Sequence, residues 1–312
     1  MKKIGLVVPC YNEEPSINLF YQAVEKVFQK MKQNGMHYDY EYLFINDGSA
    51  DKTLPIIKSL QRHDPQHVHY ISFARNFGKE SAMAAGLRYI SGDYVAVMDV
   101  DLQDPPSLLP KMLKYIQHDH YDCVGCIQTS RRENPIRAFL SAHFYKVINQ
   151  ISEVQIQPNV RDYRLMTRQY VDTVLQLPEY NRFTKGIFSW VGFKTKYLKY
   201  PGRPRAAGKS HWSLYQLFEY SLEGIIDFSD VPLKIATFIG GLSCFLSILG
   251  ILFVIIRALF FGDAVAGWPS LVSIILLIGG IQLFCLGIVG KYIGKIYLEV
   301  KHRPLYTIKE KK

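Results

Sequence analysis

Hydrophobic and polar residues follow two alternating patterns over residues 1–130. Amphipathic segments with the helical repeat predict helices at 15–33, 53–61, 79–89 and 107–117. Short apolar runs rich in β-branched residues predict strands at 4–9, 42–45, 68–73, 94–98 and 123–127. Because strands and helices alternate, we expect βαβ units that build a mostly parallel sheet with helices on both faces. Ligands of such sheets bind at the carboxyl ends of the strands.

Two uncharged stretches near the end of the chain, 235–256 and 264–290, each exceed the ~20 residues that span a bilayer. Buried core helices are the alternative, but two such runs joined by a short turn are hard to bury in a domain this small. We therefore expect a two-helix membrane hairpin with spans at about 235–256 and 268–290. Amphipathic segments at 132–154 and 213–226 either pack on the sheet or lie at the membrane interface.

The net charge of +10 is concentrated next to the second apolar stretch. Residues 291–312 hold seven basic and two acidic residues, so they carry half of the net charge. By the positive-inside rule, we expect a multi-pass protein of the cytoplasmic membrane with both termini cytoplasmic. Nucleic-acid binding explains the charge but not its location beside the membrane, so we do not expect it. The hydrophobic content of 48% excludes a disordered chain.

The five cysteines do not suggest a disulfide framework, because two of them, Cys244 and Cys285, fall in the apolar stretches. Cys123 and Cys126 form a C-x-x-C within a predicted strand. Residues three apart on a strand point to opposite faces, so we expect both thiols to be packing residues.

Acidic and amide side chains gather after the predicted strand at 94–98. Asp99, Asp101 and Gln103 supply hard oxygen ligands of the kind that bind Mg²⁺ or Mn²⁺. The alternative is that these residues only cap the next helix, as Asp104 before Pro105 could do. Their position at the end of an apolar strand favours the metal.

The motifs of the chain resemble those of family 2 glycosyltransferases. In the first half they are Val8–Glu14 (VPCYNEE), Asn46–Thr53 (NDGSADKT), Ala74–Glu80 (ARNFGKE) and Met98–Pro106 (MDVDLQDPP). The second half adds Arg161–Met166 (RDYRLM), Asn181–Gly186 (NRFTKG), Ser189–Phe193 (SWVGF) and Arg205–Ser210 (RAAGKS). The chain is most similar to the polyisoprenyl-phosphate branch, which includes bacterial bactoprenol glucosyltransferases and dolichyl-phosphate mannose synthases. The resemblance covers essentially the whole chain.

The resemblance implies an α/β fold of the GT-A nucleotide-diphospho-sugar transferase type, with a Rossmann-like mixed sheet and flanking helices. It assigns residues 1–210 to a cytoplasmic catalytic domain and 211–234 to an interfacial helix and linker. Two transmembrane helices within 235–290 and a basic cytoplasmic tail at 291–312 follow.

The resemblance also implies roles for site residues. It assigns nucleotide-sugar binding to Pro9, Tyr11, Glu13, Asp47 and Asp99. It gives the metal to Asp99, Asp101 and Gln103, and catalysis to Asp162 and Asp101. It places the acceptor phosphate at Arg131, Arg205 and Ser210. Asp162 then orients Arg164 or the sugar; a purely structural Asp–Arg pair is the alternative.

The resemblance implies an inverting, metal-dependent enzyme that transfers a hexose, first of all glucose from UDP-glucose, to undecaprenyl phosphate for cell-envelope glycosylation. Other donors (GDP-mannose, UDP-galactose or UDP-GlcNAc) and a catalytically silent, nucleotide-binding membrane scaffold are the alternatives. The implied partners are the membrane, a downstream flippase and a second glycosyltransferase, and a homo-oligomer is left open. The chain departs from the family pattern at Asn46, Gln128 and His211-Trp212.

Overall fold

The computed structural model describes residues 1–129, 149–150, 155, 157–202, 229, 231–261 and 267–312. Within them, eight strands form one mixed sheet in the order β7-β5-β6-β4-β1-β2-β3-β8. The strands are β1 (Lys3–Cys10), β2 (Asp39–Asn46), β3 (Val68–Phe73), β4 (Tyr94–Val97), β5 (Cys123–Gln128), β6 (Val160–Thr167), β7 (Thr195–Tyr200) and β8 (Ile308–Lys311). The five strands predicted from the apolar runs are confirmed; β6, β7 and β8 were not predicted.

The sheet reverses its strand order at β1. β2 pairs with one side of β1 and β4 with the other, and both pairings are parallel. β6 then runs antiparallel between β4 and β5, which makes the sheet mixed. A reversal of this kind opens a crevice beyond the carboxyl ends of the two strands, here the ends of β1 and β4.

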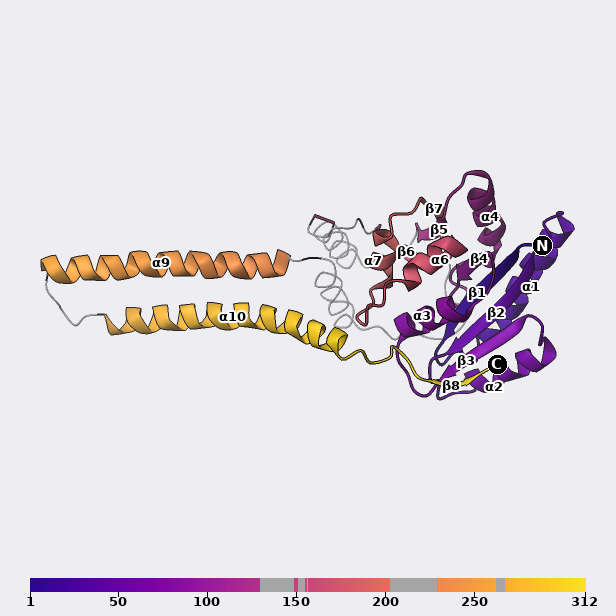
Figure 1. The fold of residues 1–312 in the computed structure, drawn as a ribbon, viewed down its shortest axis with the longest axis horizontal. Helices are drawn as coiled ribbons and strands as arrows, with labels where there is room; N and C mark the ends of the chain where they lie inside the picture. The colour runs from indigo at the N-terminus through magenta and orange to yellow at the C-terminus, as the bar shows by residue number, and fades with distance from the viewer. Residues whose placement is uncertain (130–148, 151–154, 156, 203–228, 230, 262–266) are drawn as a thin grey trace.

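Helices cover both faces of the sheet (Figure 1). One face packs against α1 (Ile17–Gln33), α2 (Thr53–His63) and α4 (Leu109–His118), which follows a 3₁₀ turn, η1 (Pro106–Leu108). The other face packs against α3 (Lys79–Tyr89), α6 (Arg168–Leu175) and α7 (Thr184–Trp190). Alternate residues of each strand enter different cores, because successive side chains of a strand point to opposite faces.

The C-x-x-C motif shows this alternation directly. Cys123 and Cys126 are buried free thiols, and they pack in the two different cores. The prediction that they are packing residues on opposite faces is confirmed.

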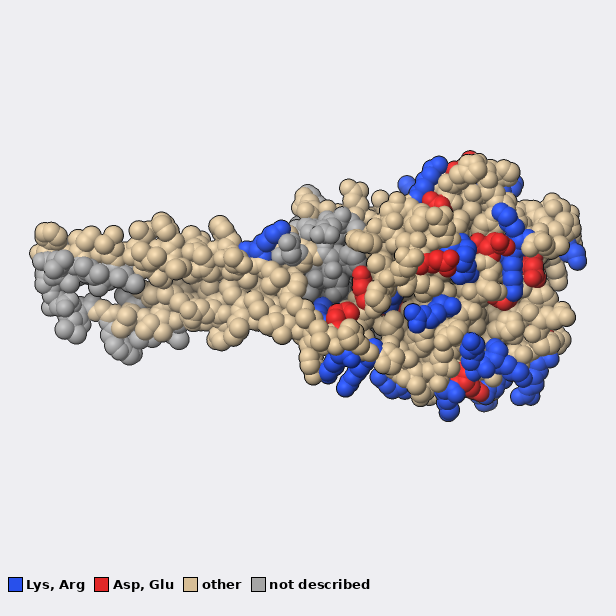
Figure 2. All heavy atoms as spheres, in the orientation of Figure 1, with Lys and Arg blue, Asp and Glu red and all other residues tan. Residues whose placement is uncertain are grey.

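Two long helices, α9 (Val231–Phe261) and α10 (Trp268–Val300), lie side by side and extend away from the sheet (Figure 1). They are apolar along most of their length, whereas charged side chains are scattered over the part of the molecule that contains the sheet (Figure 2). Large apolar side chains such as Phe245 and Leu283 are 58% and 71% exposed. Each helix contains a stretch long and apolar enough to cross a bilayer, one within Val231–Gly250 and the other within Leu277–Val300. The pair therefore indicates association with a membrane.

The chain does not end in a free tail after α10. Residues 308–311 return to the sheet as β8, which pairs antiparallel with β3 at its edge. Several predicted features lie outside the described residues: the segment 213–226, most of 132–154, and the site residues Arg131, Arg205 and Ser210.

Candidate active site at the ends of the central strands

The loops that follow β1 and β2 are joined by hydrogen bonds. The Ser49 hydroxyl accepts from the backbone N–H of Asn12, and the Asn12 side-chain oxygen accepts from the N–H of Ala50. The N–H of Glu13 donates to the Thr53 hydroxyl over 2.8 Å. These bonds hold the turn after β1, in which Tyr11 is 49% exposed. Pro9 in β1 and Tyr11 and Glu13 in the loop after it therefore lie beside the end of β2.

Asp47 and Gly48 bind the loop that follows β3. The buried Asp47 carboxylate accepts hydrogen bonds from the N–H groups of Phe77 (2.7 Å) and Gly78 (2.9 Å). Burial raises the pKa of Asp47, and the two backbone donors only partly offset this. Gly48 has a φ of +64°, and a Cβ there would lie 2.3 Å from the carbonyl carbon of Arg75. Only glycine fits this contact. Asp47 and Gly48 together therefore fix the backbone that leads from β3 into α3.

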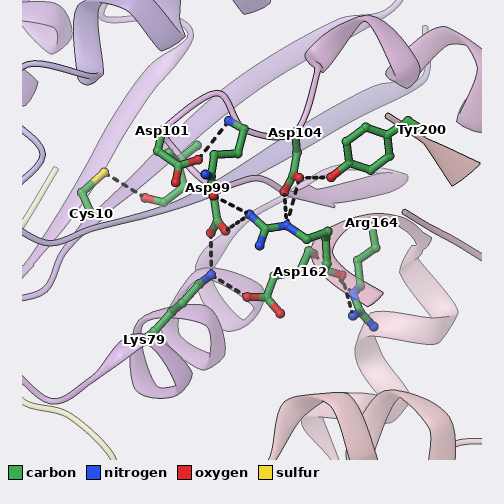
Figure 3. Close-up of polar contacts among 11 residues, drawn as sticks. Cys10, Lys79, Asp99, Asp101, Asp104, Asp162, Arg164 and Tyr200 are labelled. Atoms are coloured by element: carbon green, nitrogen blue, oxygen red, sulfur yellow. Dashed lines mark hydrogen bonds and ion pairs between the residues drawn. The ribbon is translucent and has the colours of Figure 1, made fainter. Parts of the chain in front are cut away.

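Lys79, the first residue of α3, bridges two carboxylates at the crevice (Figure 3). Its Nζ lies 2.6 Å from Asp99 Oδ1 and 2.5 Å from Asp162 Oδ2. Asp99 follows β4 and Asp162 belongs to β6, so the lysine joins neighbouring strands. Its side chain remains 42% exposed, while the two carboxylates are less than 20% exposed. The cluster is thus open to a ligand from the Lys79 side.

Arg161 forms a second bridge on the other side of Asp99. Its guanidinium donates to the buried Asp104 carboxylate over 3.0 Å and lies 3.9 Å from Asp99. It also donates to the side-chain oxygen of Gln103 over 3.2 Å. Asp104 accepts a further bond from the Tyr200 hydroxyl. Asp104 therefore holds Arg161 in place, rather than capping the next helix through its side chain.

The charges of the cluster stabilise one another. Burial alone would raise the pKa of Asp162, but Lys79 and then Lys185 hold that pKa below its usual range. Burial alone would lower the pKa of Lys79, but the charges of Asp162 and Asp99 outweigh burial and raise that pKa above its usual value. Asp162 is therefore ionised and Lys79 protonated at neutral pH. The expected alternative of an Asp162–Arg164 side-chain pair is replaced by a pair with Lys79. Arg164 instead donates to the backbone oxygen of Asp162 and stacks on Phe188 at 3.8 Å.

Glu80 connects α3 to the start of α7. Its carboxylate accepts from both the N–H and the hydroxyl of Thr184. Burial, followed by the nearby Asp162 charge, raises the pKa of Glu80 to about 8. Two consecutive residues of α3 thus contact the carboxylates of Asp99 and Asp162 through Lys79 and the start of α7 through Glu80.

The structure brings together Asp99, Asp101, Gln103 and Asp162 on the adjacent β4 and β6 side of the crevice. Asp101 is buried, and its carboxylate accepts from the N–H of Gln103 over 3.1 Å. The sequence interpretation missed the roles of Lys79 and Arg161. Both stand inside recognised motifs, ARNFGKE and RDYRLM, which was the available signal.

Carboxylate and amide oxygens of Asp99, Asp101 and Gln103 are the ligand types that Mg²⁺ and Mn²⁺ prefer, so the donor set fits a hard divalent cation. Among the described residues, no three or more His, Cys, Asp or Glu side chains are grouped so that they could hold a metal ion by themselves. A cation there needs Lys79 to release Asp99 and needs ligands from the substrate as well.

Comparison with known proteins identifies the relatives of this chain. The family model described as "Glycosyl transferase family 2" matches residues 6–175. The bactoprenol glucosyl transferase of Shigella phage SfV is 45% identical over 99% of this chain and 99% of its own length. CsbB of Bacillus subtilis, named as a glycosyltransferase, is 42% identical over 98% of this chain and 91% of its own. The solved mannosyltransferase PcManGT of Pyrobaculum calidifontis aligns over 94% of this chain and 87% of that one, with 11% identity and a TM-score of 0.46.

The matched segment begins in β1 and ends with α6, so it contains the strand ends, Lys79 and the bridged carboxylates. Full-length relatives extend the match through both apolar helices. The fold is of the GT-A type. The chain belongs to glycosyl transferase family 2 and is a glycosyltransferase.

Proposed function

We propose that this enzyme transfers glucose from UDP-glucose to undecaprenyl phosphate at the cytoplasmic face of the membrane, with inversion at the sugar. The observation that carries the proposal is the Lys79 bridge between Asp99 and Asp162, at the strand reversal of a domain tethered to two apolar helices. Relatives named as bactoprenol glucosyl transferases support the sugar and the acceptor.

The donor nucleotide lies along the β1 and β2 ends in this proposal. Tyr11 presents an exposed ring for the base, with Pro9 and Glu13 beside it. Asp47 acts mainly through the backbone of the β3–α3 loop, since both of its carboxylate oxygens are engaged there. The pyrophosphate reaches toward Asp99, where the positive charges of Lys79 and Arg161 favour it.

Asp99, Asp101 and Gln103 would hold Mg²⁺ or Mn²⁺. Such an ion neutralises charge on the departing nucleotide diphosphate. After Lys79 has released Asp99 to such an ion, its positive charge remains next to the same centre, and Arg161 keeps Gln103 oriented. Charges placed in this way before the chemical step favour the transition state over free substrate.

Asp162 orients the reacting groups and does not act as a strong base. Lys79 keeps it ionised with a low pKa, which makes it a poor proton acceptor. The acceptor phosphate needs little activation, because a phosphate monoester is already anionic near neutral pH. One of its oxygens attacks the anomeric carbon in line as the nucleotide leaves from the opposite face, so the configuration inverts.

The acceptor phosphate is bound by Arg131, Arg205 and Ser210 in this proposal, and both termini are cytoplasmic. The lipid-linked sugar is then moved by a flippase and used by a second glycosyltransferase on the other side.

The test is a product assay in membranes that contain the enzyme. Radiolabelled UDP-glucose, GDP-mannose, UDP-galactose and UDP-GlcNAc are each supplied with undecaprenyl phosphate, with and without excess EDTA. Labelled lipid is expected from UDP-glucose alone, and EDTA or Asp101→Asn should abolish it while the variant stays folded. Label from another donor corrects the sugar. Full turnover in EDTA contradicts the metal, and no lipid product from any donor contradicts the function.

A further inference from the structure

Glu299, in the last turn of α10, is bound to the catalytic domain. Its Oε1 accepts hydrogen bonds from the N–H of Tyr180 (2.9 Å), the N–H of Asn181 (3.0 Å) and the side-chain amide of Asn181 (3.3 Å). Oε2 also accepts from the Tyr180 N–H, over 3.1 Å. The Asn181 amide donates in addition to the Lys295 carbonyl over 3.5 Å. A membrane helix is thus joined to the loop before α7 by bonds to a charged acceptor.

Glu299 lies in the part of α10 that extends beyond the length needed to cross a bilayer. The 33 residues of α10 extend about 50 Å at 1.5 Å per residue, whereas the hydrocarbon core is about 30 Å thick. The charged residues of α10, Lys291, Lys295 and Glu299, all lie in its last third. The last turns therefore project beyond the apolar layer and reach the domain (Figure 1).

The anchored loop leads directly into the candidate active site. Three residues after Asn181, Thr184 begins α7 and donates to Glu80. Glu80 follows Lys79, whose Nζ bridges Asp99 and Asp162. A series of direct contacts therefore connects α10 to the carboxylates of Asp99 and Asp162, by way of the loop before α7 and the start of α3.

A second anchor holds the segment that follows α10. The Tyr306 ring stacks on Phe73, with ring centres 4.9 Å apart, and β8 then pairs with β3. Lys58 forms an ion pair with Glu310 over 2.7 Å. A cleft of about 410 Å³ lies between the two anchors, lined by Arg75, Glu80, Tyr180, Arg182 and Leu305 among others. The segment therefore spans from the α7 side of the domain to its β3 edge.

We propose that Glu299 is a positioning residue, which fixes the catalytic domain on α10 so that the active site faces an acceptor held in the membrane. The proposal rests on the proposed function, in that the acceptor is a membrane lipid. It concerns how the site is presented to the lipid, and Glu299 itself does not touch the reacting atoms.

The test compares Glu299→Ala, Glu299→Gln and the control Glu310→Ala in the full-length protein in lipid nanodiscs. Hydrogen exchange at the amides of Tyr180 and Asn181 reports the contact without any activity. Glu299→Ala should speed this exchange at least tenfold, which is about the loss of one bond to a charged group. Glu299→Gln keeps Oε1 and should restore most of the protection, and Glu310→Ala should leave these two amides unchanged.

Kinetics then separate positioning from folding. Glu299→Ala should raise the KM for undecaprenyl phosphate in the bilayer roughly tenfold, while the Kd for UDP-glucose and the use of a short, soluble prenyl phosphate stay unchanged. Equal KM values for the lipid in both proteins, or a parallel loss with both acceptors, overturn the proposal. If wild type glucosylates neither acceptor, the proposed function fails, whereas the exchange result still decides whether Glu299 anchors the loop.

Discussion

Replacing Lys79 with methionine should tighten the binding of Mn²⁺ to the donor-free protein while slowing transfer. The lysine Nζ lies 2.6 Å from Asp99 Oδ1, so an incoming cation must displace it from this carboxylate. Methionine keeps most of the apolar stem and removes only the competing charge. Transfer slows in the same variant, because the positive charge beside the departing pyrophosphate is lost.

The size of the effect follows from the exposure of the pair. Lys79 is 42% exposed, so its pair with Asp99 is screened by water and is worth about 1 kcal/mol or less. Removing that competition should strengthen Mn²⁺ binding by up to about fivefold, since 1.4 kcal/mol corresponds to a factor of about ten. Loss of both pairs should lower the free energy of unfolding by about 1–2 kcal/mol.

The assay is a titration of free Mn²⁺ by electron paramagnetic resonance, without nucleotide-sugar. Lys79→Arg retains a cation at Asp99 and should bind Mn²⁺ much as wild type does. Lys3→Met is the matched control, because it removes a lysine that is paired with Glu41 elsewhere on the sheet. Unchanged or weaker Mn²⁺ binding by a folded Lys79→Met protein refutes the competition between lysine and metal at Asp99.

Three further predictions address the loops, the buried carboxyl group and the membrane topology. Gly48→Ala should cost about 2 kcal/mol or more of unfolding free energy, because its Cβ would overlap the Arg75 backbone; Gly35→Ala, with a φ of +76° but open space, should cost about 1 kcal/mol. Urea midpoints of both variants measure the difference, and equal losses contradict the close contact. With a folded pKa of about 8 against an ordinary 4.5, Glu80 retains a proton that the unfolded chain releases, so stability should fall as pH rises from about 5 to about 8. Glu80→Gln should flatten this slope in urea titrations; an unchanged slope assigns the pH dependence to another group. A membrane-impermeant thiol reagent should reach a cysteine at 312 from the same side as the catalytic domain and one at 264 from the opposite side, and any other result contradicts the hairpin.

The first half of the fold was predictable because its signals are local. The helix expected at 79–89 matches α3, and the strand expected at 68–73 matches β3. β8 was not predicted, since Ile308–Lys311 (IKEK) has one apolar residue followed by three charged ones, within a segment interpreted as a charged tail. Only its pairing with β3, more than 230 residues away in sequence, makes it a strand.

In the candidate site too, the residues that are close together in the sequence were predicted, and those that only the fold brings together were not. The acidic side of the site was visible because Asp99, Asp101 and Gln103 are close in sequence and follow an apolar strand. Lys79 was not assigned, because a lysine at the start of an amphipathic helix is usually solvated. Its two partners are 20 and 83 residues further along the chain, so only the adjacency of β4 and β6 reveals the bridge.

The order of the strands around β1 explains why Lys79, Asp99 and Asp162 lie close together. β4 and β6 run antiparallel, with Val97 opposite Arg164, so the carboxyl end of β4 lies beside the beginning of β6. Asp99 extends from one and Asp162 from the other, and two carboxylates this close repel each other unless a cation separates them. Lys79 supplies that cation because Asp47 fixes the backbone of Phe77 and Gly78 just before it. The β2 end, expected only to bind the nucleotide, thus also places the charge that stabilises the carboxylates at the β4 end.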